Sequence, residues 1–573
     1  MEKNLRPWLK HYDQGVPSTL SPYPERTLVD YISDAAREQP DHPALLFKGS
    51  RVTYGELERL SDAFAASLAE RGVKKGDRVA LLLPNCPQFI IAELGVWKAG
   101  ATVVPLNPIY TEHELEGPLV NCDPETIVTL TLFYNRVKSI QPKTKLKRVI
   151  ATNIKEFLPP VLRVLFTLVK EKKEGHRVTL QSGDLWFSDL LKTDGPVRKP
   201  DLKVTPDMPA VILLSGGTTG TPKGAVGTHR ALAVSGLQMF SWAGDMIKRG
   251  QEILMLPLPL FHVYAHAGIQ CLAFVSRNTL SLIPNPRDIK DVLHTIRKVH
   301  PNFFVSVPTL FNALLNHPDV KAGKVDFKSI KMCISGASAL MAETKNSFEG
   351  LTGGRILEGY SLTEAMMACA VNPSAGVKKL GSIGMPLPDV EARIVDPDTG
   401  EKILPFREVG EILLRAPQLM QGYWQNPEET ATVLQTHGEG GPWLHTGDLG
   451  YMDEEGYIFI VDRKKDVIKP SGFQVWPREV EEVVSSHPAV LEVGVAGVPD
   501  DYQGEAVKAW VVLRSGEKAT IDEIRQFCRQ KLAAYKVPKH IEFRESLPKS
   551  MVGKVLRRVL AQEEREKMAK QKS

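Results

Sequence analysis

Residues 213–224 read LLSGGTTGTPKG and combine glycines, hydroxyl residues and one lysine directly after the apolar run 210–214. Glycine lets backbone N–H groups approach phosphate oxygens, hydroxyl groups donate further hydrogen bonds, and Lys223 supplies a positive charge. The stretch is not a Walker loop, because Lys223 is followed by Gly224 and not by a hydroxyl residue that could hold magnesium. We therefore predict a buried strand that leads into a phosphate-binding turn, with an ordinary Gly/Ser/Thr turn as the alternative.

The composition is that of a globular protein with more than one domain. The chain has 573 residues, of which 43% are hydrophobic and 24% charged, and a single core rarely organises that length. Its six cysteines are scattered without paired spacing, which argues against disulfides or a zinc site and indicates a reducing compartment. The net charge of +5 comes from dispersed basic residues, so we expect no nucleic-acid partner. The amino-terminal stretch lacks the apolar region of a secretory signal, and we expect a cytoplasmic protein.

Strand-like and helix-like segments alternate along much of the chain, which predicts an α/β fold of parallel sheets covered by helices. In such folds ligands bind at the carboxyl ends of the strands. Thr53 and Glu56 form a capping box ahead of an apolar helical stripe that ends at Gly72. The other expected strands are 79–83, 102–105, 253–256, 303–307, 331–335 and 355–358, and the other expected helices are 88–97 and 289–299.

Two later regions have different patterns. Residues 390–460 contain short apolar runs broken by Gly, Pro and Asp, which predicts a small β subdomain. A second unit of α+β type is expected after Arg463, because it is long enough to form its own core. Its expected elements are helix 478–486, strands 490–498 and 506–513, and a helix from the capping box at Thr520 to about Leu532. We place the boundary at Lys465, giving a large domain 1–464 and a small domain 465–573.

Four further motifs follow the glycine-rich loop in order. They are EGYSLTE at 358–364, HTGD at 445–448, DRKKD at 462–466 and PKSMVGK at 548–554. Together with the loop they resemble the signature elements of the acyl-adenylate-forming, or AMP-binding, superfamily. Residues 443–473 look most like bacterial long-chain fatty acyl-CoA synthetases. The resemblance covers nearly the whole chain, and it implies that the small C-terminal domain is mobile.

The resemblance implies that most of the motif residues bind ATP and its metal. The β- and γ-phosphates would be wrapped by Ser215, Gly216, Gly217, Thr218, Thr219, Gly220 and Lys223. The adenine slot would be formed by Gly336, Glu358, Gly359 and Tyr360. Thr363 would touch the α-phosphate, Asp448 the ribose hydroxyls, and Arg463 the ribose or phosphate. Mg²⁺ would be held by Glu364 together with Ser215.

The same resemblance assigns the small domain two tasks. Lys554 would bridge the attacking carboxylate and the α-phosphate during adenylation. For thioester formation the small domain would rotate about Lys465 and bring the loop around Gly472 to the CoA thiol. The expected catalytic set is thus Lys554, Lys223, Glu364 and His262, and the expected cofactor-binding set is completed by Lys465, Lys469 and Gly472.

The sequence favours a fatty acid as the carboxylate substrate. No Asp or Glu occurs between Ile253 and Arg287, where the acyl pocket is expected. A substrate ammonium buried there would have no counter-charge, so an amino acid is disfavoured. The apolar residues of 263–274 suit an alkyl chain, although a packed core would have the same composition. His262 stands where the family places an aromatic residue or histidine beside the reacting carboxylate, and a buried structural histidine is the alternative.

Residues 157–169, FLPPVLRVLFTLV, are too few to span a bilayer, and the basic residues of 170–177 follow at once. Such a segment can lie in a membrane interface with its basic side chains near anionic head groups. Peripheral contact with the inner face of the membrane through residues 157–177 is therefore one of two open interpretations. A buried helix or a dimer contact is the alternative, and a homodimer stays open because no pattern sets the oligomeric state.

The reaction that follows from the resemblance is ATP-dependent formation of an acyl-AMP and pyrophosphate, and then of acyl-CoA and AMP. ATP, Mg²⁺ and CoA are the expected cofactors and co-substrates, and a long-chain fatty acid is the expected substrate. The open alternatives within enzymes are a medium-chain or aryl acyl-CoA ligase, an acyl-AMP ligase for a carrier protein, and a luciferase-like monooxygenase. A fatty-acid-binding protein with a vestigial nucleotide site would have lost Lys223, Glu364, Asp448 or Lys554, and all four are present.

Overall fold

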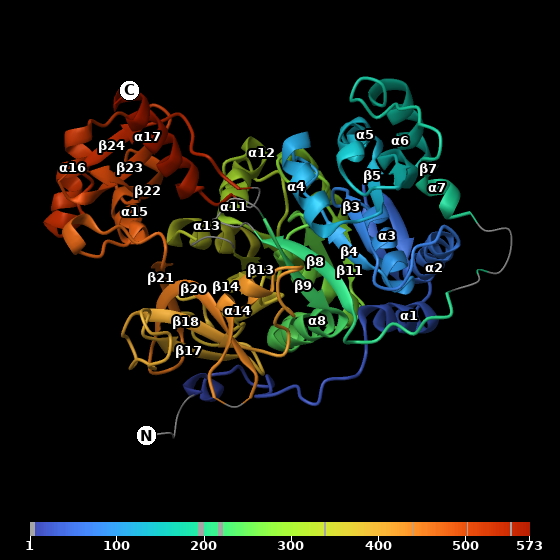
Figure 1. Cartoon of the computed structure of the whole chain (residues 1–573), viewed down its shortest axis with the longest axis horizontal. Coiled ribbons are helices and arrows are strands. Elements are labelled where there is room, and N and C mark those ends of the chain that lie inside the picture. Colours follow the sequence, from blue (N-terminus) through green and yellow to red (C-terminus); the bar gives the residue numbers. More distant parts are fainter. Residues whose placement is uncertain are drawn as a thin grey trace.

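The computed structural model describes residues 6–192, 197, 200–215, 222–336, 340–438, 440–500, 502–550 and 553–572, with side chains as far as Met568. Five of the expected phosphate-loop residues, Gly216, Gly217, Thr218, Thr219 and Gly220, lie outside these residues. Within the described part of the chain the strands form four sheets, three of which belong to the region before residue 464 (Figure 1).

The first sheet contains the strand that ends at the glycine-rich loop. Its strands, in spatial order, are β7 (Leu185–Trp186), β6 (Arg148–Thr152), β5 (Thr126–Leu130), β3 (Arg78–Leu82), β4 (Thr102–Pro105), β8 (Pro209–Ser215) and β9 (Lys223–Thr228). They are parallel except at the edge, where β8 and β9 form an antiparallel hairpin. Continuous burial along β5 and most of β8 explains why these strands read as unbroken apolar runs.

The second sheet contains the expected adenine-binding strands. Its order is β16 (Met385–Pro386), β15 (Met367–Val371), β14 (Arg355–Leu362), β13 (Met332–Ser335), β12 (Phe303–Ser306), β10 (Ile253–Leu256), β11 (Thr279–Leu282), β1 (Pro43–Phe47) and β2 (Ser50–Thr53). The inner strands β14 to β1 are parallel, so β13 and β14 end at the same edge of the sheet. That edge is where a ligand is expected in such a sheet.

Helices connect and cover the strands of the large domain. They include α1 (Leu28–Glu38), α2 (Tyr54–Glu70), α3 (Pro87–Lys98), α4 (Glu112–Cys122), α5 (Tyr134–Ile140), α6 (Pro160–Leu165), α7 (Phe187–Leu190), α8 (His229–Ala243), α9 (Cys271–Val275), α10 (Ile289–Val299), α11 (Pro308–Leu315), α12 (Pro318–Lys321) and α13 (Ala342–Thr352). Every residue of α3 is buried, which explains its lack of a polar face. The capping box of Thr53 and Glu56 begins α2, as predicted.

The third sheet is the expected β subdomain. It contains β17 (Glu391–Val395), β18 (Gly410–Arg415), β20 (Pro442–Met452), β19 (Leu434–Thr436) and β21 (Ile458–Arg463), and α14 (Pro427–Val433) precedes β19. β20 and β21 are antiparallel neighbours, and Asp448 lies opposite Arg463 in their register. Two motifs that are fourteen residues apart in the sequence are therefore brought side by side.

The carboxyl-terminal part packs as a separate unit (Figure 1). Its elements are α15 (Pro477–Ser485), β22 (Val490–Asp500), β23 (Gly504–Leu513), α16 (Ile521–Arg529), β24 (His540–Phe543) and α17 (Arg557–Lys572). Its two apolar clusters draw on residues 468–561, whereas the main core is built from residues before 461. The expected helix at Thr520 has its capping box but ends at Arg529, three residues earlier than predicted. The predicted fold class is confirmed.

Candidate functional site

The glycine-rich loop joins the two strands of a hairpin. Ser215, the last residue of β8, lies opposite Lys223, the first residue of β9. A Walker loop leads from a strand into a helix, whereas this loop leads into a second strand. Both flanking residues of the expected phosphate loop are thus held in one rigid register, and Ser215 is buried.

Lys223 has an anionic partner in the structure. Its Nζ atom pairs with the carboxylate of Glu429 near the start of α14, and it lies 5.4 Å from the centre of the Tyr423 ring. The Tyr423 hydroxyl in turn donates a hydrogen bond of 2.8 Å to Oε1 of Glu364. Tyr423 therefore links two residues of the expected catalytic set, Lys223 and Glu364.

Glu364 fits the expected metal, although it is not part of a metal-binding cluster. Among the described residues, no three His, Cys, Asp or Glu side chains converge as a metal site would require. Mg²⁺ in nucleotide sites is usually held by one or two carboxylates, with phosphate and water oxygens completing the shell. The Glu364 carboxylate, whose Oε1 atom is bound by Tyr423 near the phosphate hairpin, satisfies that requirement.

The expected adenine strip follows β13 and the end of β14. Gly336 comes directly after β13, and a Cβ atom placed on it would lie 2.9 Å from the ring of Tyr264. Glycine is needed there because any side chain would displace that ring. Glu358 in β14 lies 3.5 Å from Nζ of Lys345, and burial raises the pKa of Glu358. Gly359 follows it in the same strand.

Asp448 is the centre of a buried hydrogen-bonding group. Its Oδ2 atom accepts a hydrogen bond of 2.5 Å from the Tyr360 hydroxyl, and its Oδ1 atom lies 2.9 Å from Nε of Arg463. Each carboxylate oxygen can accept a further hydrogen bond, so ribose hydroxyls can still be bound. Thr363, the residue expected to touch the α-phosphate, begins the turn that directly follows β14.

Lys554 and Lys465 bring positive charge to the same place. The side chain of Lys554 is accessible to water, but it lies among many protein atoms. This desolvation, followed by the nearby Arg463 guanidinium, lowers the pKa of Lys554. Desolvation and Arg463 likewise lower the pKa of Lys465, and Lys223 contributes to that shift. Cations that repel one another in this way form a suitable environment for a triphosphate.

A cleft of about 380 Å³ opens beside these residues. It is lined by Thr446, Gly447, Arg463, Lys464 and Lys465. Its size lies within the range of small-molecule sites. Arg463 and Lys465 line this basic cleft, and Arg463 connects it to the Asp448–Tyr360 pair. The charges of Arg463 and Asp448 also act on Lys554.

His262 is held as a neutral side chain. Its Nδ1 atom accepts a hydrogen bond of 3.3 Å from the Tyr264 backbone N–H, and desolvation lowers the pKa of His262 to about 4. With Nδ1 as the acceptor, the proton of the neutral ring is on Nε2. His262 can therefore donate a hydrogen bond to a carboxylate but is not a cation near neutral pH.

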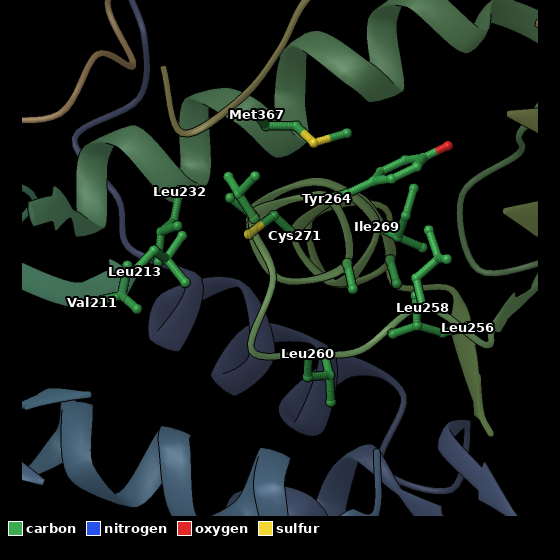
Figure 2. Close-up of a cluster of buried hydrophobic side chains, with 14 of the residues drawn as sticks. Val211, Leu213, Leu232, Leu256, Leu258, Leu260, Tyr264, Ile269, Cys271 and Met367 are labelled. Carbon is green, nitrogen blue, oxygen red and sulfur yellow. The ribbon is translucent and has the colours of Figure 1, made fainter. Parts of the chain in front are cut away.

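The apolar stretch after His262 forms part of the core. The π-helical turn Tyr264–Gln270 continues into α9, and every residue of both is buried. Figure 2 shows Tyr264, Ile269 and Cys271 between β-strand and α8 side chains such as Leu256 and Leu232. The expected acyl-pocket residues are thus assembled in one apolar layer next to His262, and they are packed against one another.

Lys469 and Gly472 do not join this group in the described structure. The Lys469 backbone N–H donates to Glu505, and Lys469 and Gly472 are both exposed. Gly472 has a φ of 86°, and no atom lies within 4 Å of the position that a Cβ would take. Gly472 thus faces solvent in this orientation of the small domain, whereas the charge of Asp448 acts on Lys554.

We expect adenylation to lose rate at alkaline pH through the titration of Lys554. The resemblance implies that the cationic form of Lys554 is the active one. Because the pKa of Lys554 lies below that of an ordinary lysine, activity should fall as pH rises through that lowered value. The measurement is kcat/KM for pyrophosphate release between about pH 7 and about pH 11. The variant Lys554→Arg should lose this alkaline decline, because a guanidinium stays protonated. An unchanged decline in that variant would assign the titration to another group.

Comparison with known proteins identifies the family. The AMP-binding enzyme family model matches residues 32–424, and the AMP-binding enzyme C-terminal domain model matches residues 479–554. The chain belongs to the AMP-binding enzyme family, which confirms the resemblance seen in the motifs.

Individual relatives cover nearly the whole chain. The chain is 41% identical over 567 residues to the long-chain-fatty-acid–CoA ligase of Bacillus subtilis (strain 168), covering 98% of this chain and 99% of that protein. It is 39% identical over 565 residues to the long-chain-fatty-acid–CoA ligase of Escherichia coli O157:H7, with coverage of 98% and 99%.

Solved structures have the same fold. The anthranilate CoA ligase AuaEII in complex with anthranoyl-AMP superposes with a TM-score of 0.83 at 26% identity, covering 96% of this chain and 99% of that chain. ATP-bound MatB from Rhodopseudomonas palustris superposes with a TM-score of 0.78 at 28% identity, covering 93% and 98%.

The sequence motifs did not reveal several residues that contact the site. Tyr423 and Glu429 hold Glu364 and Lys223, but they stand apart from the quoted motifs. A signal was present, because Asn426-Pro427 and the acidic residues after it begin a helix, with Asn426 as its cap. Arg557, three residues after Lys554, forms partly buried ion pairs that only the folded chain brings together.

Proposed function

We propose that the chain is an ATP-dependent long-chain fatty acid–CoA ligase that works through an acyl-AMP. The observation that carries this proposal is the Asp448–Arg463 pair at the edge of a basic cleft, with Lys554 within the reach of both charges, in a chain of this family. The long-chain acid is supported by relatives of that name at 38–41% identity over nearly their full length. The region after His262, which contains no Asp or Glu and is mostly apolar apart from the buried His266 and Gln270 that contact Glu93, supports the same substrate.

The chemistry follows from the weakness of a carboxylate as an electrophile. Joining the carboxylate to the α-phosphate of ATP releases pyrophosphate and gives AMP as a good leaving group, which the CoA thiol then displaces. Lys223 and Lys554 offset phosphate charge in the first step, and neutral His262 orients the carboxylate by donating from Nε2. Asp448 holds the ribose, and Tyr360 and Arg463 hold Asp448.

Mg²⁺ is part of this proposal, with Glu364 and Ser215 as its protein ligands. When bound, the ion neutralises phosphate charge and fixes the phosphate geometry. The Tyr423 hydroxyl orients the Glu364 carboxylate toward that role. ATP and CoA are substrates of the family, and we propose that CoA reaches the site through Lys469 and Gly472.

The assay that tests the function is pyrophosphate release with acids of increasing chain length, with and without CoA. A long-chain ligase gives acyl-CoA and AMP with the longer acids. Release with short or aromatic acids alone would favour a medium-chain or aryl ligase, and acyl-AMP that CoA does not consume would favour an acyl-AMP ligase for a carrier protein. Absence of AMP formation with every acid would contradict the proposal.

We also propose that the chain contacts membranes through residues 161–169. Six large apolar side chains of α6 and the π-helical turn Phe166–Lys170 are 44–78% exposed: Val161, Leu162, Val164, Leu165, Leu168 and Val169. This exposure speaks against the buried-helix alternative, and α6 lies at the periphery, away from the small domain (Figure 1). Phe157 and Leu158 instead pack against the core.

The charge around this patch suits anionic head groups. Lys172, Lys173 and Arg177 are exposed beside it. His176 does not contribute, because it is buried and desolvation lowers its pKa. Within the described residues no helix has the length and apolar content to cross a bilayer, so contact would be confined to the surface. All six cysteines are described, buried and free of disulfides, which supports a cytoplasmic location at the inner face of the membrane.

We expect Leu168→Glu to weaken binding to vesicles that contain phosphatidylglycerol by roughly tenfold, because a charge replaces a leucine that would enter the membrane interface. The matched control is Leu380→Glu, since Leu380 is 69% exposed but lies elsewhere. Sedimentation with vesicles gives the measurement. Equal binding of both variants and the unmodified protein would contradict membrane contact. A change in mass in solution caused by Leu168→Glu would instead indicate a dimer contact.

A further inference from the structure

Asp462, the first residue of the DRKKD motif, is a buried carboxylate with three donors. It lies in β21, and its side chain is 2% exposed. Oδ1 accepts from Nη1 of Arg557 at 2.6 Å and from the backbone N–H of Arg463 at 2.8 Å. Oδ2 accepts from the backbone N–H of Arg478 at 2.7 Å. A carboxylate this deeply buried is stable only when such donors satisfy it.

Two of these donors lie on the other side of the proposed hinge. Arg478 and Arg557 follow Lys465, whereas Asp462 precedes it. Arg478 is the second residue of α15, whose own N-cap residue, Trp476, makes no side-chain capping bond. Asp462 therefore caps this helix from the large domain, where a carboxylate also meets the positive end of the helix dipole. Nη1 of Arg478 adds a hydrogen bond of 2.9 Å to the Ile460 carbonyl.

Arg557 is fixed within the small domain by a second carboxylate. Its Nε and Nη2 atoms bind the two oxygens of Glu481 at 2.9 and 2.5 Å, which is a bidentate arrangement. The guanidinium thus moves with the small domain, and Nη1 is left to reach Asp462.

The contact controls where Lys554 lies. Arg557 begins α17 only three residues after Lys554, which limits their Cα separation to about 10 Å. At Gly553, next to Lys554, a Cβ atom would lie 2.6 Å from Oγ1 of Thr309 in α11, so this loop is seated closely on the large domain. Rotation about Lys465 would have to separate Asp462 from Arg557 and from α15.

We propose that Asp462 and Arg557 form a latch that positions Lys554 for adenylation and is released for thioester formation. This inference rests on the proposed two-step function. Neither residue touches the substrates, and both are positioning residues. Loss of the latch favours other orientations of the small domain, so it slows the first step and spares the second.

The test measures the two half-reactions separately. We expect Asp462→Asn and Arg557→Ala to slow pyrophosphate release by roughly 10- to 100-fold, the range for a hydrogen bond to a charged group. Acyl-CoA formation from supplied acyl-AMP and CoA should be unchanged or faster, and Arg557→Lys should restore part of the first step. The matched control is Lys536→Ala. This variant removes an ion pair with Glu479 of α15, and both residues of that pair belong to the small domain. Equal loss of both half-reactions, or of neither, would overturn the proposal.

A second measurement does not depend on activity. All native cysteines are buried, so Leu380→Cys and Tyr502→Cys, which are exposed in the large and small domains, can carry spin labels. We expect Asp462→Asn to depopulate the main inter-label distance, while Lys536→Ala leaves it unchanged. An unaltered distribution in Asp462→Asn would overturn the latch even if the protein turned out to have another activity. If Asp462→Asn shifts the distance distribution but the unmodified protein forms no acyl-AMP, only the proposed function is overturned.

Discussion

Replacement of Lys554 by alanine is expected to slow acyl-adenylate formation by about 100- to 1000-fold, the usual effect of removing a group that stabilises transition-state charge. The Lys554 backbone is held in place by Ser550, whose side chain accepts from the Lys554 N–H at 3.1 Å and whose N–H donates to the Lys554 carbonyl at 2.8 Å. The variant should therefore keep the loop and lose only the ammonium group beside Asp448.

The measurement for Lys554→Ala is pyrophosphate release from acid and ATP, compared with acyl-CoA formation from supplied acyl-AMP and CoA. The second reaction should be unchanged, because Lys554 leaves the site when the small domain rotates. Lys549→Ala is the control, since Lys549 is five residues away on the same loop and pairs with Glu492 of the small domain. A loss of both reactions in Lys554→Ala would contradict the assignment of this residue to one step.

The nucleotide site could be predicted from the sequence because each element keeps its residues close together in the chain. EGYSLTE and HTGD were found as short motifs, and the structure places Tyr360 and Asp448 within a hydrogen bond of each other. That contact itself was not predictable, because Tyr360 and Asp448 lie in two different sheets, and only the folded chain places these sheets next to each other. The same limit applies to Glu429, which meets Lys223 across 206 residues.

The fold could be predicted where local signals were strong. Capping boxes at Thr53 and Thr520 located two helices, and apolar runs located the central strands. Two features needed the structure. The antiparallel hairpin of β8 and β9 depends on sheet edges that periodicity does not define. The segment 157–169 was ambiguous because an apolar run reads alike when it is buried and when it is exposed.

The other large effect is expected at Gly472, which lies in a different loop of the small domain from Lys554. Gly472→Trp should leave acyl-AMP formation intact and reduce acyl-CoA formation at least about 100-fold, because even a small misplacement of reacting groups can cost that much. Gly472 faces solvent in this structure, where nothing apart from its chain neighbours lies within 4 Å of the Cβ position, so an indole can be accommodated there. After rotation the same indole would occupy the space that the CoA thiol arm needs.

The positive φ at Gly472 means that any side chain introduces backbone strain, and the controls must carry the same strain. Gly516→Trp meets this need, because Gly516 has a φ of 84° and equally open surroundings in the same domain. Gly472→Ala adds the strain without the bulk and should retain most acyl-CoA formation. The measurement is a pyrophosphate burst followed by acyl-AMP accumulation in the presence of CoA. If Gly472→Trp and Gly516→Trp lost thioester formation equally, strain would explain the defect. If Gly472→Trp lost adenylation together with Lys554→Ala, the two edges of the small domain could not be serving separate steps.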